Sequence, residues 1–200
     1  MMKTLYLKEK DIKIFFVIFY TVGIAGLIYP GTFSLFIALI PWSLLLNVVC
    51  LSLFHRGTRD IKTLLVFLFV CLFSIGIEMA GVSTQCIFGA YHYQGSLGIR
   101  IFNTPLIIGL NWLFLTYSTS SVLEDVKMPV VIKIVSSSAL MVAYDIVLEH
   151  MAPRLEMWEW ENNIVPLRNY LVWFGLAAIY HSLIKATGIN TQNPLSLVIL

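Results

Sequence analysis

The sequence predicts an all-α protein, a polytopic bundle of about six transmembrane helices with its N-terminus in the cytoplasm. Hydrophobic residues make up 58% of the 200 residues and charged residues only 12%, and the mean hydropathy is +0.85. A soluble domain of this length could not bury so much apolar surface. Apolar runs of about 20 residues, the length that crosses a bilayer core, alternate with short polar links. The sequence has no basic face or aromatic-basic motif, which argues against a nucleic-acid partner.

Each apolar run marks one expected span of a single integral membrane domain that covers residues 1–200. The first run follows a lysine-rich start without a small-residue cleavage site, so we expect an uncleaved first span. Pro30–Gly31 then makes a tight turn. The last six residues, 195–200, are apolar but too short to cross, so they lie in the interface or belong to a seventh, incomplete span. The six expected spans lie near residues 14–28, 32–54, 61–80, 104–122, 129–148 and 167–185.

The orientation follows from the placement of Lys and Arg, which concentrate on the cytoplasmic side of membrane proteins. With the N-terminus inside, most basic residues fall on the cytoplasmic side. This asymmetry predicts a cytoplasmic N-terminus in the cell (inner) membrane. In that orientation, the polar residues of four spans lie in the non-cytoplasmic half. The cytoplasmic set is Lys3, Lys8, Lys10, Lys13, Arg56, Arg59, Lys62, Lys127, Lys133 and Lys185, and the outer set is Arg100, Arg154 and Arg168.

Three carboxylates are the candidate catalytic groups, because ionisable side chains at membrane depth are costly and usually functional. Asp145 and Glu149 are four residues apart on a predicted helix, so their side chains share one face. Their mutual repulsion and a low-dielectric environment both favour the protonated acid, which can act as a general acid. Glu78 follows an apolar run of residues 64–77 near the end of its span. Glu78 and Glu149 also fit interfacial carboxylates without a catalytic role.

Polar and aromatic residues at the same outer level form the candidate supporting set. Asn111 and Asn169 fit either a site role or hydrogen-bonded contacts between helices. Asn169 and Trp173 are four apart, so both can face one cavity. The aromatic residues fit a belt at the lipid headgroups, or they could stabilise a developing carbocation by cation–π attraction. The supporting set is Asn111, Asn169, Tyr91, Tyr93, Trp112, Trp160 and Trp173.

The sequence offers no signal for a metal or a cofactor. Cys50, Cys71 and Cys86 fit small buried hydrophobes, since no CxxC pair or His-x-x-His spacing accompanies them. A nucleophilic-serine motif, a phosphate loop and a dinucleotide fingerprint are also missing. We therefore expect acid–base chemistry on a long apolar substrate that enters from the lipid, with neither metal nor cofactor.

Two groups of short motifs surround the candidate residues. The first reads Glu78-x-x-Gly81, Phe88–Gly89-x-Tyr91-x-Tyr93, Leu97–Gly98, Pro105 and Gly109-x-Asn111–Trp112. The second reads Asp145-x-x-x-Glu149, Trp158-x-Trp160 and Ile164-x-Pro166-x-x-Asn169–Tyr170-x-x-Trp173–Phe174. Over about residues 64–185, this combination resembles the membrane carotenoid-biosynthesis proteins, which include the carotenoid 1′,2′-hydratases and the bisanhydrobacterioruberin hydratases. The chain departs from that pattern at Ala90, Asn103 and His150, where an acidic residue, Gly and Pro are usual.

The resemblance implies addition of water across the terminal C1=C2 double bond of an acyclic carotenoid or other long isoprenoid. The lipid bilayer and other carotenoid-pathway enzymes are the further expected partners. On this hypothesis Asp145 donates the proton, Glu149 or Glu78 activates the water, and the supporting residues hold the water and shield the cation. Two alternatives stay open. One is a lycopene-cyclase-like enzyme, in which an internal double bond captures the cation, and the other is a non-catalytic carotenoid- or lipid-binding membrane protein.

Overall fold

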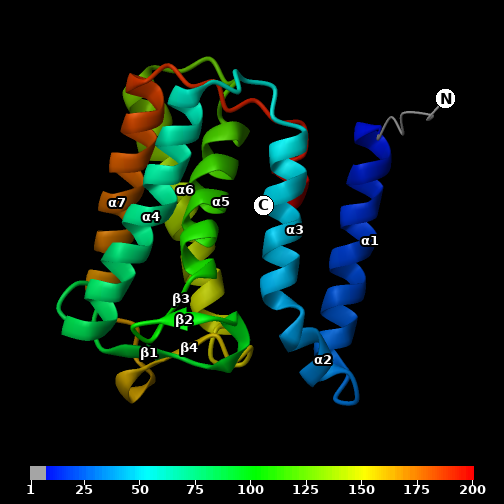
Figure 1. The fold of residues 1–200 in the computed structure, drawn as a ribbon, viewed down its shortest axis with the longest axis vertical. Coiled ribbons are helices and arrows are strands. Elements are labelled where there is room, and N and C mark those ends of the chain that lie inside the picture. Colours follow the sequence, from blue (N-terminus) through cyan, green and yellow to red (C-terminus); the bar gives the residue numbers. More distant parts are fainter. Residues whose placement is uncertain (1–7) are drawn as a thin grey trace.

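The computed structural model describes residues 8–200, which form a bundle of long helices running side by side above a floor of short strands and loops (Figure 1). Lys3, part of the predicted cytoplasmic charge, lies outside the described residues. The chain is mostly helical, as predicted. The helices are α1 (Glu9–Ile28), α2 (Phe33–Ala38), α3 (Ile40–Leu53), α4 (Ile61–Thr84), α5 (Ile107–Val122), α6 (Val130–Met151), α7 (Leu167–Ala186) and α8 (Ser196–Ile199).

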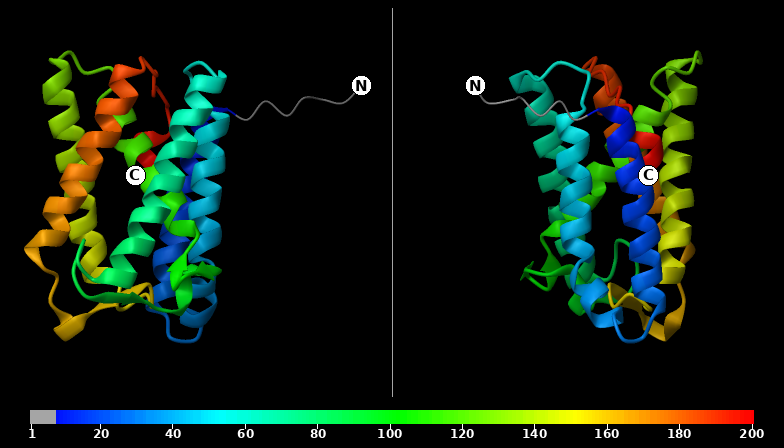
Figure 2. Two further views of the ribbon diagram at one scale, coloured as in Figure 1. Left: turned by 60° about the vertical axis from the view of Figure 1, so that its left-hand side comes forward. Right: turned by 90° about the vertical axis from the view of Figure 1, so that its right-hand side faces the viewer.

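Three helices of the described chain, α1, α4 and α6, are long and apolar enough to cross a bilayer. Helix α5 has only 16 residues, and its segment of residues 116–121 is buried, whereas α7 has 20 residues but is less apolar. The expected span at residues 32–54 is divided at Leu39. Pro41 lies in the first turn of α3, where its missing N–H costs nothing, so a new helix begins there. Figure 2 shows the long helices running roughly parallel in two further views.

The floor is made by two antiparallel strand pairs that belong to the loops following α4 and α6. Strand β1 (Tyr91–Tyr93) pairs with β4 (Trp158–Trp160), with Tyr91 opposite Trp160 and Tyr93 opposite Trp158. Strand β2 (Arg100–Ile101) pairs with β3 (Thr104–Pro105). Gly89, just before β1, has a φ of +135° and packs against Pro166 and Trp160, so a side chain would not fit there. The β1–β4 pair therefore joins two loops that are far apart in the sequence.

The apolar segment at residues 195–200 contains a helix of only four residues. It forms α8, which packs inside against α1 and α5 with Leu195 and Ile199 buried. The Tyr20 hydroxyl, on α1, donates to the Ile199 carbonyl at 3.0 Å. The segment is thus a short helix with one face packed against α1 and α5.

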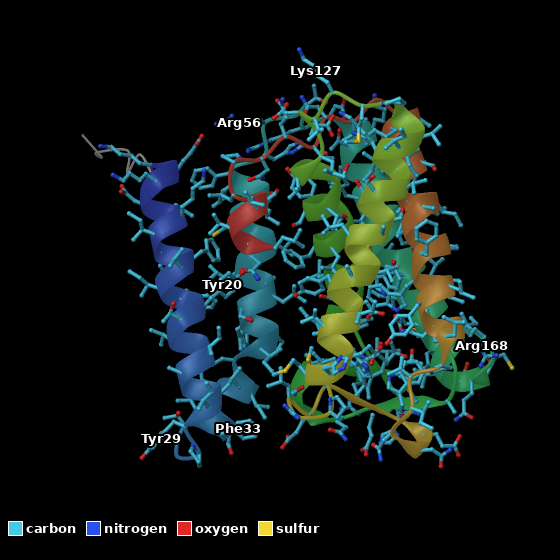
Figure 3. All side chains as sticks on the ribbon, turned by 180° about the vertical axis from the view of Figure 1, so that it is seen from behind. Tyr20, Tyr29, Phe33, Arg56, Lys127 and Arg168 are labelled. Atoms are coloured by element: carbon cyan, nitrogen blue, oxygen red, sulfur yellow. The ribbon has the colours of Figure 1, made fainter. Side chains whose placement is uncertain are left out.

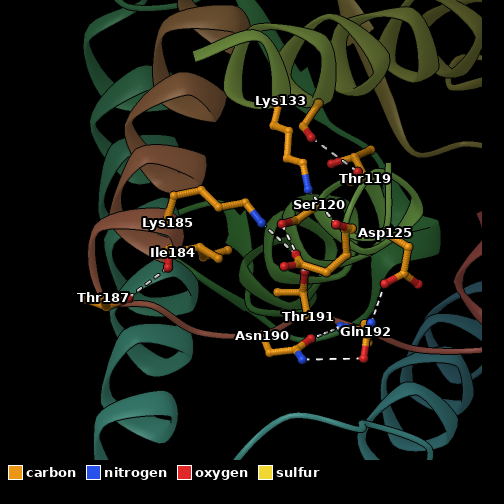
Figure 4. Close-up of polar contacts among 12 residues, drawn as sticks. Thr119, Ser120, Asp125, Lys133, Ile184, Lys185, Thr187, Asn190, Thr191 and Gln192 are labelled. Atoms are coloured by element: carbon orange, nitrogen blue, oxygen red, sulfur yellow. Dashed lines mark hydrogen bonds and ion pairs between the residues drawn. The ribbon is translucent and has the colours of Figure 1, made fainter. Parts of the chain in front are cut away.

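The two ends of the bundle differ in charge. Arg56 and Lys127 lie at one end, whereas Arg168 lies toward the other, where the floor is (Figure 3). At the end with Lys127, the carboxylate of Glu124 accepts hydrogen bonds from Lys185 Nζ at 2.6 Å and from Thr191 Oγ1 at 2.7 Å (Figure 4). These contacts tie the segment after α7 to the end of α5.

Candidate functional site

Glu78 lies on the buried face of α4 and is only 3% exposed. Its Oε2 atom accepts hydrogen bonds from the hydroxyls of Tyr91 at 2.5 Å and Tyr93 at 2.8 Å, and Oε1 accepts from Trp112 Nε1 at 2.8 Å. Alternate residues of a strand point to one face, which is why β1 delivers both tyrosines to the same oxygen. The carboxylate is therefore fixed by three donors from its own loop and from the next helix.

Glu149, near the end of α6, has a parallel set of partners. Its Oε2 atom accepts from Trp158 Nε1 at 3.0 Å and Trp160 Nε1 at 2.6 Å, and Oε1 accepts from Asn169 Nδ2 at 3.3 Å. Strand β4 supplies both indoles by the same alternation. An indole N–H can only donate, so the two tryptophans require an acceptor at this position.

The two halves of the site thus repeat one arrangement: a helix with a buried glutamate, a strand with two aromatic donors, and a following helix with a third donor. The halves also touch. The rings of Tyr91 and Trp160 lie 5.0 Å apart, and Trp112 stacks on Trp173 with ring centroids 4.0 Å apart and planes at 26°. The floor and the stacked indoles together enclose the carboxylates from two sides.

The halves differ at the position four residues before each glutamate. In α4 this position is Ser74, whose hydroxyl is hydrogen-bonded to the Tyr180 hydroxyl at 2.8 Å. In α6 it is Asp145, which is fully buried. Asp145 Oδ2 accepts from Asn169 Nδ2 at 3.1 Å, but Oδ1 is buried without a hydrogen-bond partner among residues 8–200. Most buried polar atoms have a hydrogen-bond partner, so Asp145 differs from the two glutamates in keeping one oxygen unoccupied.

The structure brings most of the predicted site residues together. We name Glu78, Asp145 and Glu149 the acid cluster. Asn111 is the exception: it is half-buried, and it lines a neighbouring cavity of about 410 Å³ instead of contacting a carboxylate. The residues gathered around the acid cluster are Tyr91, Tyr93, Trp112, Trp160, Asn169 and Trp173.

Trp158 was missed as a site residue, because an aromatic belt explained it equally well. The spacing did indicate its position. Trp158 and Trp160 are two residues apart, so on a strand both indoles face the same side. Tyr180 was missed as well. Its ring packs edge-on against Trp112 at 5.9 Å, and nothing in the local sequence pointed to it.

The two tyrosines of β1 lie in the loop outside the membrane-spanning helices. Burial, followed by the nearby Glu78 carboxylate, raises the pKa of both Tyr91 and Tyr93 above the usual range. Both phenols are therefore neutral donors at ordinary pH. Within residues 8–200, no group of three or more His, Cys, Asp or Glu side chains is arranged to hold a metal ion.

These features define a helical membrane protein with a carboxylate–aromatic site in its interior, at one end of the bundle. The chain matches the carotenoid biosynthesis protein family over residues 39–197 and belongs to that family. The match spans every helix from α3 to α7 and all the site residues. No match was found among curated proteins or among solved structures. Membership gives the protein a role in carotenoid biosynthesis, points to a biosynthetic enzyme, and implies an isoprenoid or carotenoid substrate.

Proposed function

We propose that the protein adds water across the terminal C1=C2 double bond of an acyclic carotenoid end group and forms a tertiary alcohol. The observation that supports this most is the unpartnered Oδ1 atom of Asp145. The two glutamates have both of their oxygens occupied by fixed donors, whereas Asp145 keeps one oxygen available. A buried carboxylic acid with a free O–H is the group that an acid-initiated reaction needs.

The reaction begins when the Asp145 carboxylic acid transfers its proton to C2, the less substituted carbon. The double bond breaks and a tertiary cation forms at C1. A water molecule then attacks C1 and gives one proton to Glu149, which shares the Asn169 amide with Asp145. Return of that proton to Asp145 restores the enzyme, and the sum is the addition of one water. Glu78 is the second candidate for the water-activating role.

Aromatic rings are placed to stabilise the cation and to exclude other water. Trp112 and Trp173 form one stacked wall, and Tyr91 and Trp160 form another. Cation–π attraction contributes about 2 kcal/mol or more per ring when the site is desolvated. Three donors hold the Glu78 oxygens in place, so this side chain does not capture the cation.

We also propose a membrane topology. Residues 1–200 form one domain that crosses the cell membrane six times with its N-terminus in the cytoplasm, and the site lies in the non-cytoplasmic half. The concentration of Lys and Arg at the end opposite the floor supports this orientation. Cys86 is exposed and lies just after α4, on the side of the floor. A membrane-impermeant thiol reagent should label Cys86 in intact cells, and labelling only after permeabilisation would reverse the orientation.

The function is tested by expressing the chain in a lycopene-producing bacterium and analysing the pigments by mass. The wild-type chain should give products heavier by one or two waters with an unchanged chromophore, and Asp145→Asn should abolish them. Asp125→Asn, an exposed aspartate at the opposite end, is the matched control. A ring without added oxygen would instead establish a cyclase. If lycopene is unchanged, the same experiment is repeated with a C50 precursor. If the C50 pigment binds to the protein but is also unchanged, the protein is a binding protein. Full hydration by Asp145→Asn would refute the donor role.

A further inference from the structure

A cavity of about 410 Å³ lies beside the acid cluster and is lined by residues of α1, α3, α5, α6 and α8. We call it the near cavity. Its wall is mostly apolar and includes Tyr144 and Leu148 of α6, Trp158 of β4 and Phe114 of α5. Tyr20 of α1 and Asn47 of α3 also line it, and the Tyr20 hydroxyl donates to Asn47 Oδ1 at 3.1 Å.

Trp158 connects the near cavity to the acids. Its ring lines the cavity, and its indole N–H donates to Glu149. Trp160 donates to the same oxygen at the shorter distance of 2.6 Å. Glu149 would therefore keep a fixed donor if the Trp158 ring moved. The Trp158 ring therefore separates Glu149 from the near cavity, and a chain in the cavity reaches the acids only if this ring turns aside.

A second cavity of about 580 Å³ lies on the other side of the α3–α5 contact, between α3, α4 and α5. We call it the far cavity. Leu51, Phe67 and Cys71 line it, and its polar end holds Tyr117. The two cavities share one lining residue, Phe114, which is 3% exposed.

Together the cavities follow α3 over its whole length. The near cavity uses Ile40 to Asn47 and the far cavity begins at Val48. At about 1.5 Å rise per residue, α3 is about 20 Å long. Each cavity alone falls within the roughly 300–1,000 Å³ that holds a drug-sized ligand. A short isoprenoid would fit in one of them, whereas a long linear chain that presents its end to the acids needs both.

We propose that the two cavities are one binding site for a linear polyene, which crosses between α3 and α5 past Phe114 and extends from the acid cluster into the far cavity. This inference rests on the proposed function for the identity of the reacting end. It makes Phe114 the residue that determines chain length, because its side chain must turn aside for a chain that continues beyond the near cavity. It also predicts that a bound polyene covers the Cys71 thiol.

Cys71 is the built-in reporter for the test. In the purified protein carrying Cys50→Ser and Cys86→Ser, Cys71 is the remaining thiol, and its rate of reaction with a membrane-permeant maleimide is measured. Bound C40 acyclic polyene, quantified by its visible absorbance, should slow the reaction about tenfold, which corresponds to about 1.4 kcal/mol. A C20 acyclic isoprenoid should leave the rate unchanged.

Phe114→Trp enlarges the side chain at the junction and should remove the C40 protection. Phe15→Trp, the same change at a residue of α1 that is 44% exposed, should preserve it. The decisive measurement uses the protein that carries only Cys50→Ser and Cys86→Ser. If this protein does not bind the C40 polyene, or binds it without protection of Cys71, the inference is overturned, whatever Phe114→Trp and Phe15→Trp show. The labelling does not depend on hydration. Protected Cys71 without hydrated product would reject the proposed function alone, and hydrated product with unprotected Cys71 would reject this inference alone.

Discussion

Replacing Glu78 by glutamine probes how strictly the site requires an acceptor. The carboxylate accepts the hydroxyls of Tyr91 and Tyr93 on one oxygen and the indole of Trp112 on the other. Glutamine keeps one oxygen and replaces the other by an N–H₂ group. If its oxygen faces the tyrosines, two donors meet at Trp112. If its oxygen faces Trp112, the tyrosine hydroxyl protons lose their acceptor. In either orientation at least one buried donor is left unpaired.

The expected loss of stability follows from the number of buried donors left unpaired. A buried donor without a partner costs about 1–3 kcal/mol, more than the average of about 0.6 kcal/mol for a hydrogen bond between transmembrane helices. Glu78→Gln should therefore lower the free energy of unfolding by about 1–3 kcal/mol. Trp112→Phe removes the opposing indole donor, so the double variant should lose at least 0.5 kcal/mol less than the sum of the single losses.

The assay is denaturant unfolding in detergent micelles, followed by helical circular dichroism because two of the variants lack Trp112. The four proteins of the cycle are wild type, the two single variants and the double variant. If the two losses add within about 0.3 kcal/mol, Glu78 and Trp112 do not share a hydrogen bond. That result would contradict the contact between Trp112 Nε1 and Glu78 Oε1.

Three further predictions concern the floor and the helix contacts. Trp158→Phe and Trp160→Phe should each cost about 1 kcal/mol, and together more than their sum, because the shared carboxylate oxygen then has no indole donor; thermal unfolding measures this. Burial raises the pKa of Tyr91 in the folded protein above its usual 10.0. As the pH rises, the unfolded chain therefore loses the Tyr91 proton before the folded protein does, and the free energy of unfolding should fall above roughly pH 10. Tyr91→Phe should reduce this decline in a pH series of unfolding curves, and an unchanged decline would exclude Tyr91 as its source. Gly109→Ala would place a Cβ 2.6 Å from a backbone carbonyl of α4 and should cost about 1–3 kcal/mol. The control Gly175→Ala meets nothing within 4 Å and should not destabilise the protein.

Much of the helical arrangement could be predicted from periodicity and length. The expected span at residues 61–80 became α4, Ile61–Thr84, because its apolar run has one physical solution in a bilayer. The shared face of Asp145 and Glu149 also followed from their spacing, and the Asn169 amide does contact both. These features depend on local geometry, which a sequence pattern carries.

Contacts between distant segments could not be predicted in the same way. The antiparallel pairing of β1 with β4 depends on two loops meeting in space, and three-residue strands give almost no periodic signal. The roles of Asn111 and Trp112 depended on helix rotation: adjacent residues point about 100° apart, and it is Trp112 that faces Glu78. The position of α8 was equally hidden, since an apolar segment of six residues fits an interface or an interior.

The repeated arrangement of the site bears on how the chain enters the membrane. The three donors to Glu78 lie in β1 and α5, which follow α4, and the three donors to Glu149 lie in β4 and α7, which follow α6. Each helical hairpin can therefore satisfy its own glutamate before the hairpins meet. A bare carboxylate costs about 2.5–3.5 kcal/mol at the bilayer centre on insertion scales and less near the end of a span, and local pairing would reduce this cost during synthesis. Asp145 shares the Asn169 amide of its own hairpin, so joining the halves through β1 and β4 completes an aromatic enclosure around acids that are already in place.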